Sequence, residues 1–238
     1  MADDGVRETD ARSEVTAVAG TAQPASGPES AAAAALFGER VELATRYATL
    51  LTTTGISHGL LGPREAPRVW NRHVLNCAAL VEVLPSTGKL ADVGSGAGLP
   101  GLVLAIARPG LRVTLIEPLE RRVRWLESVR VELGLDNVTV LRARAEDVEE
   151  RFDLVTARAV APLGTLARWC LPLLGPGGSL LAMKGSAAAE EVTQARSALR
   201  ALRAGSVRIE SCGQVLVDPP TTVVVVGAPA VPQRRKRS

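Results

Sequence analysis

One glycine-rich segment constrains this chain more than any other, and it reads Asp92-Val93-Gly94-Ser95-Gly96-Ala97-Gly98-Leu99-Pro100-Gly101. A short apolar stretch precedes it, and an apolar helical pattern over 99–107 follows. Glycine lets the backbone turn sharply and lets a ligand lie against it. The first turn of a helix offers N–H groups without intrahelical partners. The segment therefore predicts a strand, a loop and a helix that together hold a cofactor.

The spacing of the glycines narrows the kind of cofactor. A dinucleotide-binding loop follows the pattern G-x-G-x-x-G. That pattern would place its third glycine at position 99, where the chain has Leu99. The glycines fall instead at 94, 96 and 98, behind an acid, Asp92. This spacing disfavours a nicotinamide dehydrogenase.

Composition excludes few classes of protein. The 238 residues include 28 Lys and Arg against 25 Asp and Glu, and a net charge of +3 is too small to prove a nucleic-acid partner. Nearly all the cations are arginine, which suits phosphate and guanine edges. We favour a codon-composition bias as the cause of that count, because Ala, Gly and Val are also abundant.

Three cysteines stand far apart, so we expect neither a disulfide framework nor a metal site. No apolar run approaches the length of a membrane span. The first residues are acidic, where a signal peptide would be basic. We therefore expect a cytoplasmic protein without membrane contact, and nothing in the sequence suggests an obligate dimer, so we expect a monomer.

The chain divides into four parts by composition and pattern. Residues 1–34 show no sustained period and predict a disordered extension. Residues 35–88 predict N-terminal helices, one over 36–51 and one that starts near Arg68, with a loop over 55–67. Residues 89–228 predict a domain of alternating strands and helices, and 229–238 predict a basic tail. We expect strands at 89–93, 112–117, 137–141, 152–156, 179–183, 206–212 and 221–226, and helices at 99–107, 119–133, 163–174 and 187–203.

Alternating strands and helices predict an α/β fold with a mostly parallel, seven-stranded sheet covered by helices on both faces. The last two strands lack a helix between them, so we expect them to pair antiparallel. A ligand in such a sheet binds at the carboxyl ends of the strands, at the switch point. Four strand ends should therefore contribute to the site. Their candidate residues are Gly94, Gly96 and Leu99, then Glu117, then Ala145 with Glu146, and finally Arg158.

The glycine spacing behind an acid resembles motif I of the class I S-adenosylmethionine (AdoMet) methyltransferases, which have a Rossmann-like fold. The longer run to Gly101 resembles one family within that class, the bacterial small-subunit rRNA guanine-N7 methyltransferases (RsmG, formerly called glucose-inhibited division protein B). The match covers 36–185 and continues more weakly to 226. It also rests on Arg72-His73-Val74-Leu75-Asn76, Arg121-Arg122-Val123-Arg124-Trp125-Leu126, Arg158-Ala159 and Lys184-Gly185.

The resemblance implies methyl transfer from AdoMet to N7 of a guanine in small-subunit (16S) rRNA, with that rRNA or the ribosomal particle as the partner. Its AdoMet contacts fall on Gly94, Leu99, Ala145, Glu146 and Arg158. Glu117 is the expected partner of the ribose hydroxyls, since it lies about 20 residues after the glycine motif, as in dinucleotide folds.

The resemblance also makes Arg72, His73 and Lys184 candidates to position RNA. Guanine N7 already has a free lone pair, so we assign no catalytic base. His73 lies in an apolar stripe, which favours a buried packing histidine over a catalytic one.

Several interpretations stay open. Glu117 also suits a charge at a helix N-terminus, and Glu146 also suits a solvated acid among its acidic neighbours. The whole chain could act on a small molecule or a protein, or it could bind AdoMet as a regulator without turnover.

Overall fold

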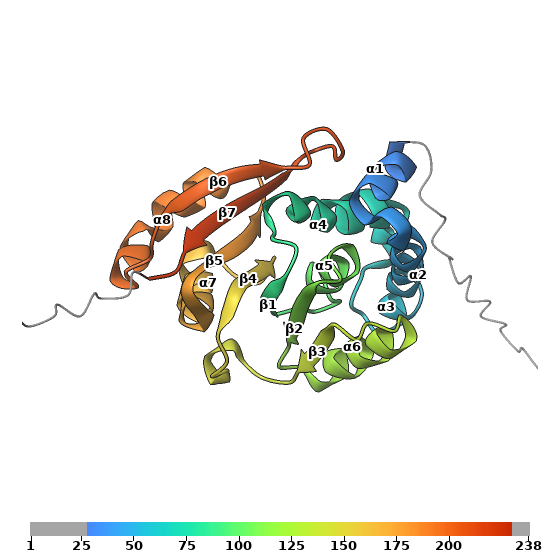
Figure 1. Ribbon diagram of the computed structural model, residues 1–238, viewed down its shortest axis with the longest axis horizontal. Helices are drawn as coiled ribbons and strands as arrows, with labels where there is room; N and C mark the ends of the chain where they lie inside the picture. Colours follow the sequence, from blue (N-terminus) through green and yellow to red (C-terminus); the bar gives the residue numbers. More distant parts are fainter. Residues whose placement is uncertain (1–27, 230–238) are drawn as a thin grey trace, which may run out of the picture.

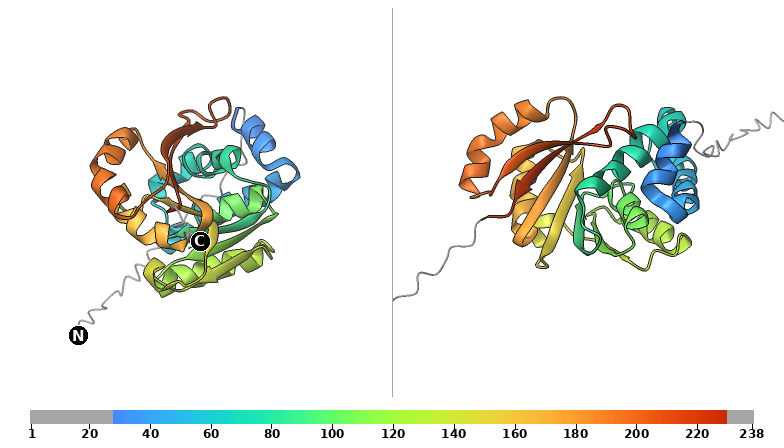
Figure 2. Two further views of the ribbon diagram at one scale, coloured as in Figure 1. Left: turned by 60° about the vertical axis from the view of Figure 1, so that its left-hand side comes forward. Right: turned by 45° about the horizontal axis from the view of Figure 1, so that its top comes forward.

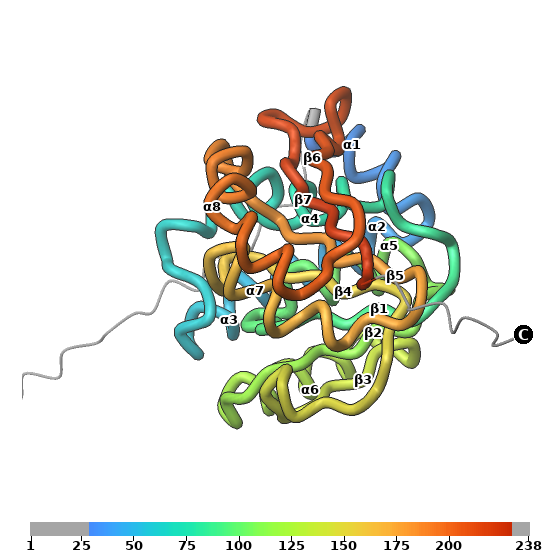
Figure 3. The backbone as a smooth tube through the Cα atoms, turned by 90° about the vertical axis from the view of Figure 1, so that its left-hand side faces the viewer, coloured from blue at the N-terminus to red at the C-terminus, as the bar shows by residue number. Residues whose placement is uncertain are grey.

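A seven-stranded sheet runs through the centre of the protein, whose residues 28–229 are described by a computed structural model (Figure 1). The strand order is β3-β2-β1-β4-β5-β7-β6, and it can be followed from the bottom to the top of Figure 3. Strand β7 is antiparallel to both of its neighbours, and the other neighbours are parallel. This confirms the expected sheet. The strands are β1 (Gly88–Val93), β2 (Leu111–Ile116), β3 (Val138–Leu141), β4 (Phe152–Arg158), β5 (Leu174–Lys184), β6 (Val207–Cys212) and β7 (Thr221–Gly227).

Helices cover both faces of the sheet. Successive strand residues point to opposite faces, so Leu90 packs with the N-terminal helices, α5 and α6, whereas Ala91 packs with α7 and α8. Figures 1 and 2 show the N-terminal helices and α8 at opposite sides of the molecule. Within 28–229, no helix is both long and apolar enough to span a bilayer. The helices are α1 (Pro28–Phe37), α2 (Val41–Thr52), α3 (Thr54–Ser57), α4 (Asn76–Ala78), α5 (Gly101–Ala107), α6 (Glu120–Glu132), α7 (Leu163–Cys170) and α8 (Ala188–Ala201).

Helix α1 shows that the expected disordered extension was too long. Residues 28–34 are helical, and Ala32, Ala33 and Leu36 are buried. Alanine is the best helix former, and its small side chain lets α1 pack closely on α2. The low-complexity composition therefore concealed a helix. The rest of the expected extension, 1–27, and the tail from 230 lie outside the described residues.

The second N-terminal helix is less regular than its sequence period predicts. The expected loop over 55–67 contains part of α3 and a 3₁₀ segment, Pro63–Arg68. A π-helical segment, Val69–Leu75, then leads into α4 and a further 3₁₀ segment, Ala79–Val83. Pro67 accounts for the interruption before Val69, because proline lacks an N–H donor and fixes its own φ. The wider π turns coincide with the residues that contact the end of β4.

Strand β5 begins earlier than expected. We expected this strand at 179–183, but Leu174, ahead of Gly175-Pro176-Gly177-Gly178, already pairs with Phe152 of β4. The register then shifts before Leu154 pairs with Ser179. Gly177 has a φ of +78°, so the glycines form an irregularity inside the strand pairing and do not precede it.

The first residue of α5 must be glycine. A Cβ at Gly101 would lie 2.7 Å from Oδ2 of Asp92 and would also meet the side chain of Leu115. We expect Gly101→Ala to lower the free energy of unfolding by roughly 1–3 kcal/mol, the range for overpacked sites. Denaturant titration followed by circular dichroism measures this change.

Gly62→Ala is the matched control. A Cβ added at Gly62 would have no atom within 4 Å, and the φ of −71° at this position suits alanine. We expect a change below about 1 kcal/mol. Equal stabilities for the two variants would contradict the close contact at Gly101.

Candidate functional site

A cavity of about 700 Å³ opens at the carboxyl ends of β1, β2, β3 and β4. Its wall includes the loops that follow these four strands, which are the four strand ends that the sequence predicts. The seven residues expected to bind a cofactor all line it: Gly94, Gly96, Leu99, Glu117, Ala145, Glu146 and Arg158.

The loop after β1 is shaped by left-handed glycines and by contacts on both of its sides. Gly94 has a φ of +69°, and a Cβ there would come within 2.9 Å of Val160. Gly96 has a φ of +56°, and a Cβ added there would meet only one atom, a backbone oxygen at 3.8 Å. Substitution is strained at both positions, since L residues rarely adopt this region. The loop can therefore keep its backbone close to a ligand.

Two buried side chains hold this loop from outside the cavity. Asp92, at the end of β1, accepts the N–H of Gly101 through Oδ2 at 3.0 Å. The hydroxyl of Tyr47, in α2, donates to the carbonyl oxygen of Ala97 at 2.6 Å. Both side chains are fully buried. Burial raises the pKa of Asp92 to about 7, because removing the carboxylate from water penalises its charged form.

Glu117 directly follows β2, and its carboxylate is almost completely buried in the cavity wall. Oε2 accepts the N–H of Gly96 at 3.0 Å, and Oε1 accepts the N–H of Leu119 at 3.1 Å. Arg122, which also lines the cavity, has Nη1 3.5 Å from Oε2. A carboxylate has about four acceptor positions, and the two backbone N–H groups use two of them while Arg122 approaches a third, so Glu117 keeps capacity to accept from a ligand hydroxyl group.

The third strand end offers one buried residue and one exposed residue. Ala145 is buried and begins a 3₁₀ turn, whereas Glu146 is exposed at the rim. Trp169 of α7 lines the same cavity, and so do Leu60 and Leu61 from the N-terminal region. No sequence motif pointed to these three apolar residues.

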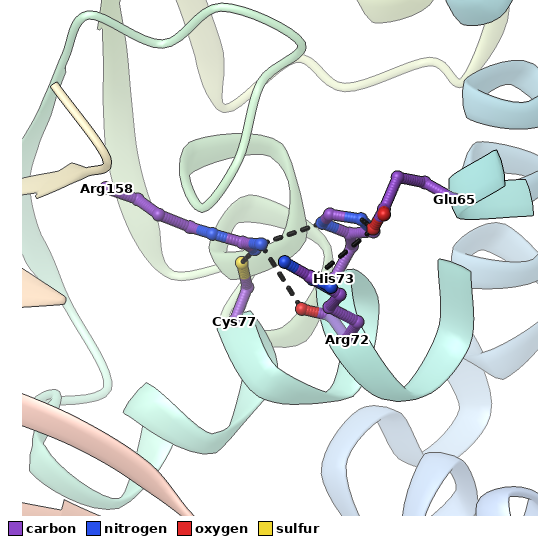
Figure 4. A network of polar contacts seen from close by, with 5 residues as sticks. All are labelled: Glu65, Arg72, His73, Cys77 and Arg158. Atoms are coloured by element: carbon purple, nitrogen blue, oxygen red, sulfur yellow. Dashed lines mark hydrogen bonds and ion pairs between the residues drawn. The ribbon is translucent and has the colours of Figure 1, made fainter. Parts of the chain in front are cut away.

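Arg158, the last residue of β4, is held by a polar network from the N-terminal region (Figure 4). Its Nη2 lies 2.7 Å from Nδ1 of His73 and 3.2 Å from the carbonyl oxygen of Arg72, and its Nη1 lies 2.9 Å from Sγ of Cys77. On the far side, Nε2 of His73 lies 2.9 Å from a carboxylate oxygen of Glu65. Arginine can only donate, so Nδ1 of His73 accepts and Nε2 carries the proton.

This network fixes the position of the His73 ring through both of its nitrogens. Burial, and then the charge of Arg158, lower the pKa of His73. Both nitrogens of the neutral ring have hydrogen-bond partners, which agrees with the packing interpretation. His73 is also one of the residues that line the first cavity. The side chain of Arg72 is exposed and pairs with Glu65 at 3.3 Å, and Arg72 lines neither this cavity nor the one that adjoins it.

A second cavity, of about 600 Å³, adjoins the first. Segment 158–160 lines both cavities, and Ala159 has a φ of +54° there. Such strain in a residue other than glycine is concentrated at functional sites. Lys184, at the end of β5, lines this second cavity together with Asn76, Glu191 and Gln194.

Sequence reasoning missed Tyr47, Glu65 and Glu191. Tyr47 is the only tyrosine in the chain, and Glu191 is one of two adjacent acids in a helix, so neither stands out as a motif. Their roles arise from contacts across long sequence separations, such as the 50 residues between Tyr47 and Ala97.

The lowered pKa of His73 predicts a pH dependence of stability. Neutral His73 accepts from Arg158, and its protonation is less favourable in the folded than in the unfolded chain. Its contribution is therefore complete above the ordinary pKa of 6.5 and is lost as the pH falls through the lowered value. We expect the unfolding free energy to fall faster below pH 6.5 in the wild type than in His73→Gln, by at most about 1.4 kcal/mol per pH unit.

Denaturant titrations between pH 7.5 and about 5 measure this difference. Comparing two proteins removes the contribution of other titrating groups, Asp92 among them. His58→Gln is the control, because His58 is exposed, and it should keep the wild-type profile. Parallel profiles for the wild type and His73→Gln would contradict the assigned network.

Comparison of this chain with known proteins also indicates a methyltransferase. The family described as rRNA small subunit methyltransferase G matches residues 40–218. A protein named ribosomal RNA small subunit methyltransferase G from Salinispora tropica is 52% identical over 226 residues, which cover 89% of this chain and 93% of that protein. One of the same name from Paenarthrobacter aurescens is 54% identical over 195 residues, which cover 81% and 90%.

Among solved structures, a ribosomal protein L11 methylase from Lactobacillus delbrueckii subsp. bulgaricus superposes with a TM-score of 0.52. The two chains share 16% sequence identity, and the match covers 67% of this chain and 79% of that one. This likeness shows the fold, that of the Rossmann-like methyltransferases. The family match over residues 40–218 and the relatives that are 52% and 54% identical show that this chain belongs to the rRNA small subunit methyltransferase G family.

Proposed function

We propose that this chain transfers the methyl group of AdoMet to N7 of a guanine in small-subunit rRNA. The observation that carries this proposal is the wall shared by the two cavities, segment 158–160. A methyl donor in the first cavity and a base in the second would meet at this wall. The names of the relatives support the rRNA of the small subunit as the substrate class.

The residues of the first cavity fit AdoMet. Glu117 offers a buried carboxylate for the ribose hydroxyls, and the glycine-rich loop around Gly96 offers a backbone with few side chains for the methionine part. Ala145 and Glu146 flank the space for the adenine. When bound, AdoMet supplies a methyl group activated by its sulfonium.

The reaction demands little acid or base chemistry from the protein. Guanine N7 has a lone pair in the neutral base, so no proton has to be removed before attack. The protein contributes orientation and proximity, which are worth several kcal/mol in well-aligned sites. The base must leave its stack to reach a pocket of this kind.

We assign Arg158 to shaping the wall between the cavities. Its Nη atoms already donate to His73, to Cys77 and to the backbone of Arg72. It therefore presents a fixed surface at the place where donor and acceptor meet. Loss of its partners would let the guanidinium turn into either cavity.

We further propose that the chain acts in the cytoplasm as a monomer, on rRNA or on a ribosomal particle. The proposed substrate itself implies the cytoplasmic location.

Glu117→Gln tests the cofactor cavity. The substitution removes the negative charge that would bind the ribose hydroxyls and leaves one carboxamide oxygen for the N–H groups of Gly96 and Leu119. We expect AdoMet to bind about 10- to 100-fold more weakly, the range for a hydrogen bond to a charged group. Isothermal titration calorimetry measures this affinity.

Glu120→Gln serves as the control for charge. Glu120 lies in the first turn of α6, its side chain is 45% exposed, and it pairs with Arg124 and Arg142 and does not line the cavity. Its loss should leave the affinity for AdoMet unchanged. An unchanged affinity in Glu117→Gln would contradict the assignment of this cavity.

The reaction itself is tested with labelled AdoMet and small-subunit RNA or particles from a strain that lacks the enzyme. We expect labelled 7-methylguanosine after nucleoside analysis. Label in another nucleoside would overturn the N7 assignment. Label in protein alone, or bound AdoMet without any product, would overturn the rRNA assignment.

A further inference from the structure

The second cavity contains an ion pair whose hydrogen-bonding groups are only partly used. Nζ of Lys184 lies 2.7 Å from Oε2 of Glu191, in the first turn of α8. The same Nζ donates to the carbonyl oxygen of Ala161 at 2.8 Å, and the same Oε2 accepts the N–H of Leu163 at 2.9 Å. The Lys184 side chain is 9% exposed and that of Glu191 is 25% exposed. The pair is therefore fixed from both sides.

Each of the two side chains has one hydrogen-bonding position that is not used within the described part of the chain. An ammonium has three donors, and Lys184 uses two of them. In the described part of the chain, no donor reaches the other carboxylate oxygen of Glu191, Oε1. Because both side chains line the cavity, the pair presents one donor beside one acceptor to whatever occupies it.

This order of groups matches the Watson–Crick edge of guanine. Guanine presents the O6 acceptor and then the N1–H and N2–H donors. Adenine presents a donor at N6 and an acceptor at N1, which is the reverse order. We propose, on the basis of the proposed function, that Lys184 donates to O6 and that the free Oε1 of Glu191 accepts from the N2 amine together with N1–H, so that Glu191 selects guanine over adenine.

The arrangement also suits the charge that develops in the reaction. The N7–methyl bond forms as the sulfur–methyl bond breaks, the electron pair of that bond stays on sulfur, and no proton moves. The purine becomes positively charged. The carboxylate of Glu191, on the N1 and N2 side, stabilises this charge and offsets the charge of Lys184 beside O6, in the way that preorganised groups stabilise a transition state. N7 lies on another edge of the purine, so it remains free to face the shared wall.

The Glu191→Gln variant distinguishes a role of Glu191 in recognising the base from a purely structural role in the ion pair. Glutamine keeps an oxygen that can accept from Leu163 and Lys184. Its amide NH₂ takes the place of the second oxygen and cannot accept from N1–H or N2–H. A structural role therefore predicts little effect on methylation, whereas a reading role predicts a loss in kcat/KM for RNA with an unchanged Kd for AdoMet.

The experiment uses small-subunit RNA with guanosine or inosine at the nucleotide where the wild type forms 7-methylguanosine, assembled by ligation after that position is mapped. Inosine lacks only the N2 amine and keeps N7, N1–H and O6. We expect the wild type to lose about 10-fold or more in kcat/KM on inosine, since a hydrogen bond to a charged acceptor is lost. In Glu191→Gln, kcat/KM on guanosine should fall about 10- to 100-fold, and the preference for guanosine over inosine should fall towards 1.

Glu190→Gln is the matched control, because Glu190 is the adjacent acid and is exposed outside the cavity. It should retain the wild-type preference. Equal rates of the wild type on the two RNAs would overturn the proposal while leaving the methyltransferase assignment intact, and this comparison needs no variant. An unchanged preference in a folded Glu191→Gln would overturn it as well. Failure of the wild type to form 7-methylguanosine would overturn the proposed function and this inference together.

Discussion

The close approach of helix α5 to the end of strand β1 is the constraint on which the cofactor cavity depends. Asp92 is buried and accepts the N–H of Gly101, while the absence of a Cβ on Gly101 leaves room for Asp92 and Leu115. The chain between these two residues must turn within a short distance, which requires glycines with positive φ. The resulting loop leaves backbone groups, with few side chains, facing the cavity. Burying a charged carboxylate costs free energy, and burial accordingly raises the pKa of Asp92.

The N-terminal helices complete the site and are more than an appendage to the sheet. Tyr47 holds the glycine loop from α2, and Leu60 and Leu61 line the first cavity. The π-helical segment brings His73 to Arg158. The sheet and the N-terminal helices thus form one unit around segment 158–160. Substitutions in the N-terminal helices should therefore affect the binding of both the cofactor and the substrate.

Local patterns in the sequence predicted most of the fold. The alternation of apolar strands and amphipathic helices indicated the seven strands, and the tendency of ligands to bind at the carboxyl ends of parallel strands located the cavity at four strand ends. Predictions were wrong where local signals were ambiguous: the alanine-rich start of α1, the broken helix after Pro67 and the glycines inside β5. The network around Arg158 could not be predicted, because His73 is 85 residues away in the sequence. Such pairs depend on how elements pack in three dimensions, and a single sequence carries no local mark of them.

The central claim is that the donor and the base occupy adjoining cavities that are both lined by segment 158–160, so that the methyl group and N7 meet beside this segment. A crystal structure with S-adenosylhomocysteine tests this most directly. The account predicts the ligand in the cavity of about 700 Å³, with its ribose at Glu117 and its sulfur directed towards Ala159 and Val160. A ligand in the second cavity, or a sulfur that faces away from this wall, would contradict it.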